Sequence, residues 1–520
     1  MLLNLKALIV VLAIASIVFW LARPLVMPFA SAVDFERRRN LWFAVTAAAF
    51  LAPTFWVFAA IAAPLIIWGA RRDSNPIALY AALLFVIPSI GIDIPVVGIN
   101  RLFDLNILRL LALCILAPLA WRLYREGRRS PARGFQGADL LLLGFGALQV
   151  ILFVPPDPVT VHNVIFHNSP TNVLRTGFLF LLDIYVLYYA VSRFCTNRQV
   201  FSEVLATFFL ASLILAPIAV FESVRHWLLY AGIGPRWGVP LPVDTYMMRG
   251  GALRAQVTAG HAITLGYLFD VALGFWLFLQ SRVPSTSAKV LVPVVLGAGL
   301  LVTYSRAPWL VAIVIYFAYV ALGTRALPRL FKTACAAALV GVTIATSPLG
   351  YHIVRLVPFL GESAAADNSL QYREALADRS WNLIQQHPFF GDQFIYPEMA
   401  DLRQGEGIID FVNEYAQVAL FYGGVGLALF LGFVFVAIIK VYRVTRDVGR
   451  NDPELHEMGR ALLASMFGTL LLIASDNLLS VSGNVFYALA GLMCAYAHLP
   501  RRASAGAQAQ ARTAWVSSIQ

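Results

Sequence analysis

The sequence predicts an all-α, polytopic integral membrane protein. Hydrophobic residues make up 59% of its 520 residues and charged residues only 13%, whereas soluble domains carry about 25% charged residues. Apolar segments of about 20 residues, long enough to span a bilayer, recur along the whole chain. These runs are continuous rather than alternating, which disfavours a β-barrel. Open sheets are excluded, because every backbone N–H and C=O group in lipid needs a hydrogen-bond partner within the protein.

About 14 transmembrane helices are expected, within a range of about 12 to 15. The count depends on residues 41–69, which Pro53 and Pro64 interrupt, so that this run is either one tilted helix or a hairpin. In chain order, the expected spans are 4–30, 41–69, 77–92, 105–121, 138–154, 176–192, 201–221, 259–280, 289–303, 307–322, 331–348, 413–440, 459–478 and 482–498.

Lysines and arginines in the short loops predict the orientation of these spans. The loop 122–136 carries five arginines and is expected to be cytoplasmic, and alternation from there puts the other basic loops on the same side. The net charge of +11 follows from this bias and does not indicate nucleic-acid binding. The run Glu36-Arg37-Arg38-Arg39 departs from the pattern, because it would face outward if residues 1–30 cross once from the inside.

Five regions follow from this topology. They are N-terminal transmembrane helices (1–136), central helices with outer loops 155–175 and 222–258 (137–348), a large periplasmic loop (349–412), C-terminal helices (413–498) and a disordered cytoplasmic tail (499–520). The four cysteines lie in spans or at their inner ends, so no disulfide framework is expected.

The large loop 349–412 is the first candidate for function. It is polar, it contains nine acidic residues and four arginines, and it lies between two long apolar segments. Long loops without regular structure are uncommon in compact proteins unless they are functional.

Three arginines are expected on the outer side at or near membrane depth, where a charge is costly and tends to mark function. Arg254 precedes a span, Arg306 lies at a tight turn between two apolar runs, and Arg373 begins the first helical stretch of the large loop. A guanidinium group suits a bidentate grip on phosphate. The alternative is that each arginine extends to the interface or pairs with a nearby acid.

A polar stripe is predicted where the chain re-enters the membrane after the large loop. Asp410, Asn413, Glu414 and Gln417 are spaced to share one helical face. They can bind sugar hydroxyls or supply a general base, although Asp410 also fits a helix N-cap. His261 follows Arg254 by seven residues, hence on the same face if that segment is helical.

Over residues 175–440 the chain resembles the bacterial O-antigen ligase and polymerase family (Wzy/WaaL-like). Five short elements carry the resemblance, in this order: Arg254 with Gly260-His261-Ala262-Ile263; Ser305-Arg306-Ala307; Arg373 followed by Trp381, His387-Pro388 and Gly391; Val412-Asn413-Glu414-Tyr415; and Gly423-Gly424-Val425-Gly426-Leu427.

The resemblance implies a glycosyltransferase of the bacterial inner membrane, with its active site facing the periplasm and an undecaprenyl-pyrophosphate-linked glycan as substrate. Arg254, Arg306 and Arg373 would then bind the pyrophosphate, and His261, Asn413 and Gln417 the rest of the substrate. Ligases of the family carry a histidine, thought to be the catalytic base, where this chain has Val412. We therefore expect a polysaccharide polymerase for O-antigen, capsule or exopolysaccharide, with Asp410 or Glu414 as the general base.

No metal or other cofactor is expected, and the expected partners are membrane lipid, a chain-length regulator and a flippase. Two alternatives stay open: a ligase that moves finished polymer onto lipid A-core, and a flippase for lipid-linked oligosaccharides. A flippase should place charges at mid-membrane depth, and three aspartates fall in apolar runs: Asp183, Asp270 and Asp476.

Overall fold

The computed structural model describes most of the chain. The described residues are 2–96, 101–127, 136–154, 159–161, 164–166, 170–239, 248–249, 251–324, 326–346, 364–403, 409–449 and 451–499. The predicted tail beyond Leu499, and residues 349–363 and 404–408 of the predicted large loop, lie outside this set.

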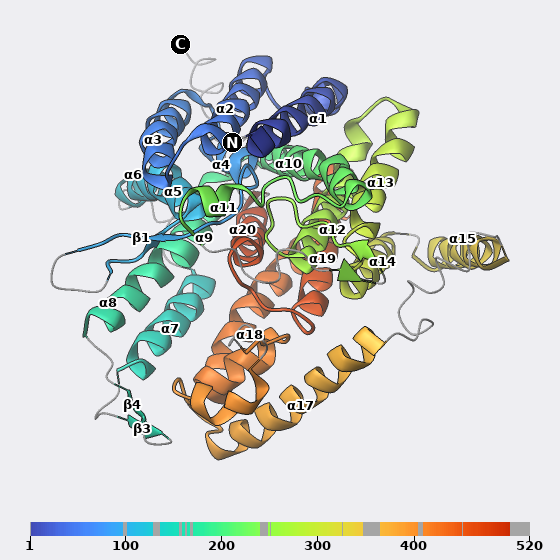
Figure 1. The fold of residues 1–520 in the computed structure, drawn as a ribbon. Helices are drawn as coiled ribbons and strands as arrows, with labels where there is room; N and C mark the ends of the chain where they lie inside the picture. Colours follow the sequence, from blue (N-terminus) through green and yellow to red (C-terminus); the bar gives the residue numbers. More distant parts are fainter. Residues whose placement is uncertain are drawn as a thin grey trace, which may run out of the picture.

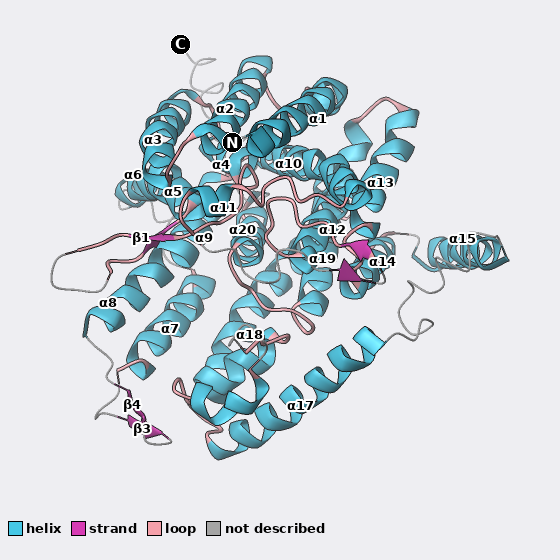
Figure 2. Ribbon diagram, in the orientation of Figure 1, coloured by secondary structure: helices cyan, strands magenta, loops and turns pink. Residues whose placement is uncertain are grey.

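The described part of the chain is a bundle of α-helices (Figures 1 and 2). The N-terminal half contains α1 (Leu2–Val26), α2 (Ala32–Leu51), α3 (Phe55–Arg72), α4 (Pro76–Leu83), α5 (Ile107–Leu111), π-helix η1 (Ala112–Leu116), α6 (Ala117–Gly127), α7 (Gly137–Leu152), α8 (Pro170–Leu179), π-helix η3 (Phe180–Tyr185), α9 (Val186–Phe194), α10 (Arg198–Arg225) and α11 (Ile233–Arg236).

The C-terminal half contains α12 (Ala262–Leu279), 3₁₀ helix η5 (Gln280–Arg282), α13 (Thr286–Leu301), α14 (Arg306–Ala321), α15 (Ala326–Thr346), α17 (Ala364–Gln386), 3₁₀ helix η6 (Tyr396–Leu402), α18 (Glu414–Val448), α19 (Pro453–Leu472) and α20 (Val481–Tyr496). Strands form three short antiparallel hairpins: β1 (Ile92–Asp93) with β2 (Asp104–Leu105), β3 (Val159–Val161) with β4 (Val164–Phe166), and β5 (Met248–Arg249) with β6 (Ala252–Leu253).

Seven helices among the described residues are long and apolar enough to cross a membrane. They are Leu3–Val26, Phe55–Arg72, Ile107–Gly127, Pro170–Phe194, Arg198–Arg225, Ala262–Arg282 and Glu414–Val448, and four shorter apolar helices accompany them. The all-α membrane class is therefore confirmed, whereas the number of about 14 spans stays a prediction.

The structure decides one alternative that the sequence left open and corrects two expected spans. Residues 41–69 form a hairpin, because Pro53 lies in the turn between α2 and α3. The expected span 77–92 is wrong, since α4 ends at Leu83, and Pro88 would in addition interrupt any helix that continued to residue 92. The expected span 459–478 has the observed length of 20 residues but is displaced along the chain, because α19 runs from Pro453 to Leu472 and leaves Asp476 in a loop.

Helices α10 and α12 form the centre of the bundle. Each packs against the other, and more than four fifths of each apolar stretch is buried inside the protein. Helices α1, α4 and α13 cover α10, and α14 and α19 cover α12. Helix α15 projects from the bundle in Figure 1.

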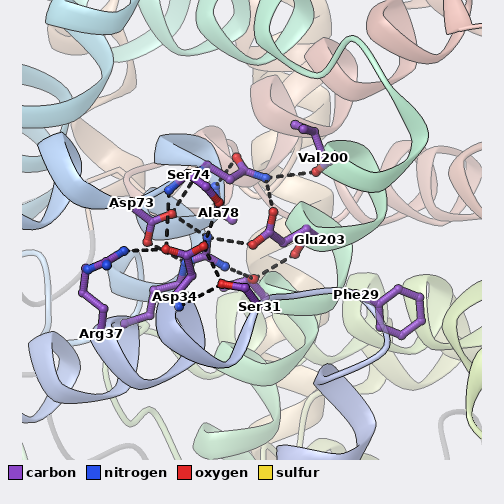
Figure 3. A network of polar contacts seen from close by, with 12 residues as sticks. Phe29, Ser31, Asp34, Arg37, Asp73, Ser74, Ala78, Val200 and Glu203 are labelled. Carbon is purple, nitrogen blue, oxygen red and sulfur yellow. Dashed lines mark hydrogen bonds and ion pairs between the residues drawn. The ribbon is translucent and has the colours of Figure 1, made fainter.

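Buried ion pairs gather at one end of the bundle, which we call the basic end. The guanidinium of Arg38 lies 2.8 Å from Asp73 Oδ2 and 2.8 Å from Glu203 Oε1, so it joins α2, the α3–α4 turn and α10. Figure 3 shows the surrounding hydrogen bonds. Asp139 pairs with Arg193 at the same end, as does Arg198 with Asp452. Arg38 therefore lies with the other basic loops, so the run 36–39, whose side the sequence left open, follows the same charge pattern.

The other end of the bundle, the loop end, gathers the predicted outer segments. Asn4 donates to Gly232 O (3.0 Å), so the start of α1 lies here, and α1 brings Arg38 to the basic end. Arg236 donates to Leu51 O (2.7 Å), and Thr258 donates to Phe85 O (2.9 Å).

Candidate active site at the loop end

Three arginines from separate segments meet at the loop end. Arg249 ends β5, Arg306 is the first residue of α14, and Arg373 lies within α17 rather than at its start. The pKa of Arg249 is lowered, first by burial and then by the positive charges of Arg306 and Arg373. Neighbouring positive charges repel one another, and a nearby anion offsets that repulsion. This arginine cluster is thus suited to a multiply charged anion.

The turn before α14 is held by two of the arginines that precede it in sequence. Arg249 donates to Tyr304 O (2.9 Å), while Arg254 donates to Thr303 O (3.1 Å) and Ser305 Oγ (2.7 Å). Arg254 is only 8% exposed. It thereby fixes the turn that presents Arg306, and its predicted contact with an anion stays a prediction.

Three carboxylates lie beside this cluster. Burial raises the pKa of Asp476, in the α19–α20 loop, to about 7. The Asn477 amide opposes this shift, Asp410 and Glu414 add to it, and Arg373 opposes it. Arg373 therefore connects the cationic and acidic parts of one site.

The predicted polar stripe is only half helical. Helix α18 begins at Glu414, because the side chain of Asn413 accepts hydrogen bonds from the amides of Tyr415 (3.0 Å) and Ala416 (3.1 Å). Asp410 therefore lies before the helix and is not its N-cap, so the prediction of one helical face for all four residues is wrong. Glu414 and Gln417 do share a face and line the same cavity.

The start of α18 is tied to the α19–α20 loop. The Glu414 amide donates to Ile473 O (2.8 Å), and its carboxylate accepts from the Leu478 amide (2.8 Å). The carboxylate is thus held against the α19–α20 loop at the wall of the cavity.

A polar cavity of about 470 Å³ opens beside Glu414 between α5, α7, η3, α18 and α20. Its wall combines one guanidinium, carboxyl and amide groups, and aromatic rings. The residues with these side chains are Asp104, Asn106, Arg109, Phe145, Gln149, Asp183, Glu414, Gln417, Phe421, Tyr422, Asn484 and Tyr487. Amides and rings side by side are typical of sites that bind polar organic ligands.

The turn 387–391 docks α17 onto α18. Gly423 breaks α18 with a φ of 63°, and the amides of Gly424 and Val425 instead donate to Pro388 O (2.8 Å) and Phe389 O (3.1 Å). Gly391 also has a positive φ, and a Cβ there would lie 2.7 Å from the Gly423 nitrogen. Both glycines are required for this close approach.

His261 and Val412 were also singled out from the sequence, and the structure places each of them outside the arginine cluster and the polar cavity. His261 precedes α12, and the segment from Arg254 to His261 is not helical, so the shared-face argument for His261 is wrong. Val412 packs against the apolar cluster beneath α17 that includes Leu376 and Phe421.

Sequence reasoning missed two groups. Arg249 was not among the arginines singled out from the sequence, and the ion pair of Arg109 with Asp183 joins positions 74 residues apart. Asp476 carried a usable signal, because Ser475-Asp476-Asn477 interrupts an apolar run. Among the described residues, no group of three or more His, Cys, Asp or Glu side chains has an arrangement that could hold a metal ion.

The fold and site define a polytopic helical membrane protein with an arginine cluster and a polar cavity. Residues 291–431, from within α13 to within α18, match the protein family described as O-antigen ligase (Wzy_C). This segment contains Arg306, Arg373, Asp410 and Glu414. A search of curated proteins found no match. The matched segment lies within residues 175–440, over which the sequence resembles the O-antigen ligase and polymerase family, so the match supports that resemblance.

Replacing Gly391 or Gly423 by alanine should detach the 387–391 turn from α18. Each change forces an alanine into a positive φ and into contact with the facing backbone, and should lower the free energy of unfolding by about 1–3 kcal/mol. Thermal unfolding in lipid nanodiscs measures this. Gly297→Ala is the matched control, because nothing lies within 4 Å of the added Cβ. Equal stability of all three variants would contradict the docking argument.

Asp476→Asn should change how stability depends on pH. The folded-state pKa of about 7 exceeds the ordinary value of 3.8, so stability from the protonated form is complete below about pH 4 and is lost as pH rises to about 7. The wild type should therefore lose stability relative to Asp476→Asn across this window, and the difference should level off above it. Melting temperatures from pH 4.5 to 8 measure the effect, with Ser475→Ala as the control. A constant difference would refute the shifted pKa.

Proposed function

We propose that the protein is a polysaccharide polymerase of the bacterial inner membrane, with its loop end in the periplasm. It would join repeat units linked to undecaprenyl pyrophosphate. The observation that supports this most is the meeting of Arg249, Arg306 and Arg373 beside Asp410, Glu414 and Asp476. A glycosyl transfer from a lipid pyrophosphate needs cations that stabilise the leaving group and a carboxylate that accepts the proton of the acceptor hydroxyl.

In the proposed step, an acceptor sugar hydroxyl attacks the anomeric carbon of the donor. The new glycosidic C–O bond forms as the bond between the anomeric carbon and the phosphate oxygen breaks, and the electron pair leaves with the pyrophosphate. The hydroxyl proton passes to a carboxylate. Arginines placed at the leaving group stabilise the charge that develops there, which is usually the largest catalytic contribution.

Glu414 is the best placed of the carboxylates to accept the proton. It lines the polar cavity, whereas Asp410 precedes the helix and hydrogen-bonds to Tyr372 Oη through its backbone amide (3.0 Å). The Leu478 amide orients the Glu414 carboxylate and leaves its other oxygen for a substrate hydroxyl.

A ligase remains the second candidate within the family. The position of the ligase histidine is Val412, which packs in an apolar cluster, so this chain offers no imidazole there. This arrangement favours the polymerase, in which a carboxylate takes over the role of the base.

A flippase is the candidate from another class. Asp183, one of the aspartates in apolar runs, is paired with Arg109, and Asp476 lies in a loop. Asp270 is fully buried in α12 without a hydrogen-bond partner among the described residues. One such group is a weaker basis for transport than the clustered charges at the loop end are for group transfer.

Purified protein given labelled undecaprenyl-pyrophosphate repeat unit should produce a ladder of longer lipid-linked chains. Arg306→Ala and Arg373→Ala should each slow this by about 10²–10³, the effect of removing one oxyanion donor, and Arg373→Lys should also fail if a bidentate fork is needed. Transfer only after lipid A-core is added would make the protein a ligase. If neither product forms when the native repeat unit is supplied, the result would favour the flippase.

Glu414→Gln should reduce the polymerisation rate more than Asp410→Asn, because only Glu414 lines the cavity. General-base catalysis contributes about 10²–10⁴ in rate, so a loss of that size is expected for Glu414→Gln. Rates at several pH values distinguish a lost base from misfolding, since the residual activity should lose its pH dependence. Unchanged rates in both variants would leave the site without its proposed base.

A further inference from the structure

We propose that the cavity beside Glu414 is a binding site for the acceptor glycan, separate from the arginine cluster that holds the donor pyrophosphate. This inference rests on the proposed function and adds the location and chemistry of the second substrate. The cavity volume of about 470 Å³ lies within the range of about 300–1,000 Å³ that small-molecule sites occupy.

The charge of the cavity wall favours sugar hydroxyls over a pyrophosphate. Its one guanidinium, that of Arg109, contacts Asp183 through Nε (3.0 Å) and Nη2 (2.8 Å) and also pairs with Asp104. The Glu414 carboxyl adds a third acid to this wall. A multiply charged anion would be repelled here, whereas hydroxyl groups can both donate to the carboxylates and accept from the amides.

The ion pair also gives the cavity a fixed shape. Arg109 donates to the Asp104 carbonyl (2.6 Å) and thus joins β2, α5 and the π-helix η3, which carries Asp183. A π-helix places a side chain out of register with a regular α-helix and is frequently found at functional sites. A rigid wall of this kind lowers the entropic cost of ordering a glycan.

Gln417 supplies an independent observation. It lines the cavity one turn after Glu414, and its amide oxygen is buried without a hydrogen-bond partner among the described residues. Buried polar atoms are normally paired, so this amide is poised to bind a polar ligand. The rings of Phe145, Tyr422 and Tyr487 add apolar surface on which a sugar ring can pack.

The position of Glu414 connects the two sites. Its carboxyl group lines the cavity and also acts electrostatically on Asp476, on which Arg373 acts as well. A glycan in the cavity can therefore bring a hydroxyl to the proposed base, while Arg373 and the other arginines hold the donor leaving group outside the cavity. Asp104, Arg109, Gln149 and Asp183 precede the family-matched segment 291–431, so the N-terminal helices would select the acceptor.

The test uses full-length protein in nanodiscs and two probes: undecaprenyl pyrophosphate, and the repeat-unit glycan on a benzyl group without pyrophosphate. The wild type should bind both. Gln149→Ala and Gln417→Ala, on different helices, should each weaken glycan binding by about two- to tenfold, the effect of one hydrogen bond, and leave undecaprenyl pyrophosphate binding unchanged. Arg249→Ala should do the reverse.

Arg101→Ala is the control, because Arg101 lies close in sequence to the lining residue Asp104 but is not itself part of the cavity wall. It forms an exposed ion pair with Asp93 (3.1 Å) instead. In turnover assays the cavity variants should raise KM for the acceptor and not for the donor. Failure of the wild type to bind the benzyl glycan, or a selective loss of undecaprenyl pyrophosphate binding in the cavity variants, would overturn the proposal. Glycan binding that depends on Gln149 and Gln417, in a protein without transferase activity, would instead refute the proposed function alone.

Discussion

The site depends on the contact between the 387–391 turn and the break in α18 at Gly423. A break in a membrane helix leaves backbone groups unpaired, and each costs several kcal/mol in lipid. The turn pairs them, because Pro388 and Phe389 accept from the freed amides, and the Asp392 amide donates to Leu420 O (2.8 Å). This contact fixes the start of α18 relative to α17, and therefore Glu414 relative to Arg373. The His-Pro and Gly-Gly elements are thus architectural, and in the proposed function the charged residues around them would carry the chemistry.

The N-terminal helices depend on a second set of interactions at the basic end. Arg38 is 4% exposed and pairs with two carboxylates from different elements. Removing one partner of such a buried group leaves a charge uncompensated, which is far more costly than replacing the whole group by apolar side chains. The network therefore fixes how α2, α4 and α10 pack, and α4 leads directly into Ser89 and Gly91 at the edge of the polar cavity.

The sequence predicted the helices well, because long apolar runs and the charges that end them are local signals. It also singled out Arg306, Arg373 and Glu414, whose charges stand out against apolar flanks, and the structure places all three at the loop end. It failed where a role depends on a distant partner. Two examples are the pairing of Arg109 with Asp183 and the approach of Arg249 to Arg373. Each brings together segments that are far apart in the sequence. The error at Asp410 is of another kind, because the helical spacing was correct but the cap at Asn413 decides where the helix begins.

The α19–α20 loop carries Asp476, which is influenced both by Arg373 and by the carboxylates of Asp410 and Glu414. This position limits which carboxylate can act as a base. A base close to arginines is stabilised as a carboxylate and loses affinity for a proton, whereas a base far from them cannot serve the same reacting carbon. Asp476 experiences both influences, since burial raises its pKa and Arg373 lowers it. Glu414 is attached to the same loop through Ile473 and Leu478. An anion bound at the arginines would screen their positive charge from Asp476 and Glu414. The proton affinity of these carboxylates would rise, so they would accept a proton more readily once the proposed donor is in place.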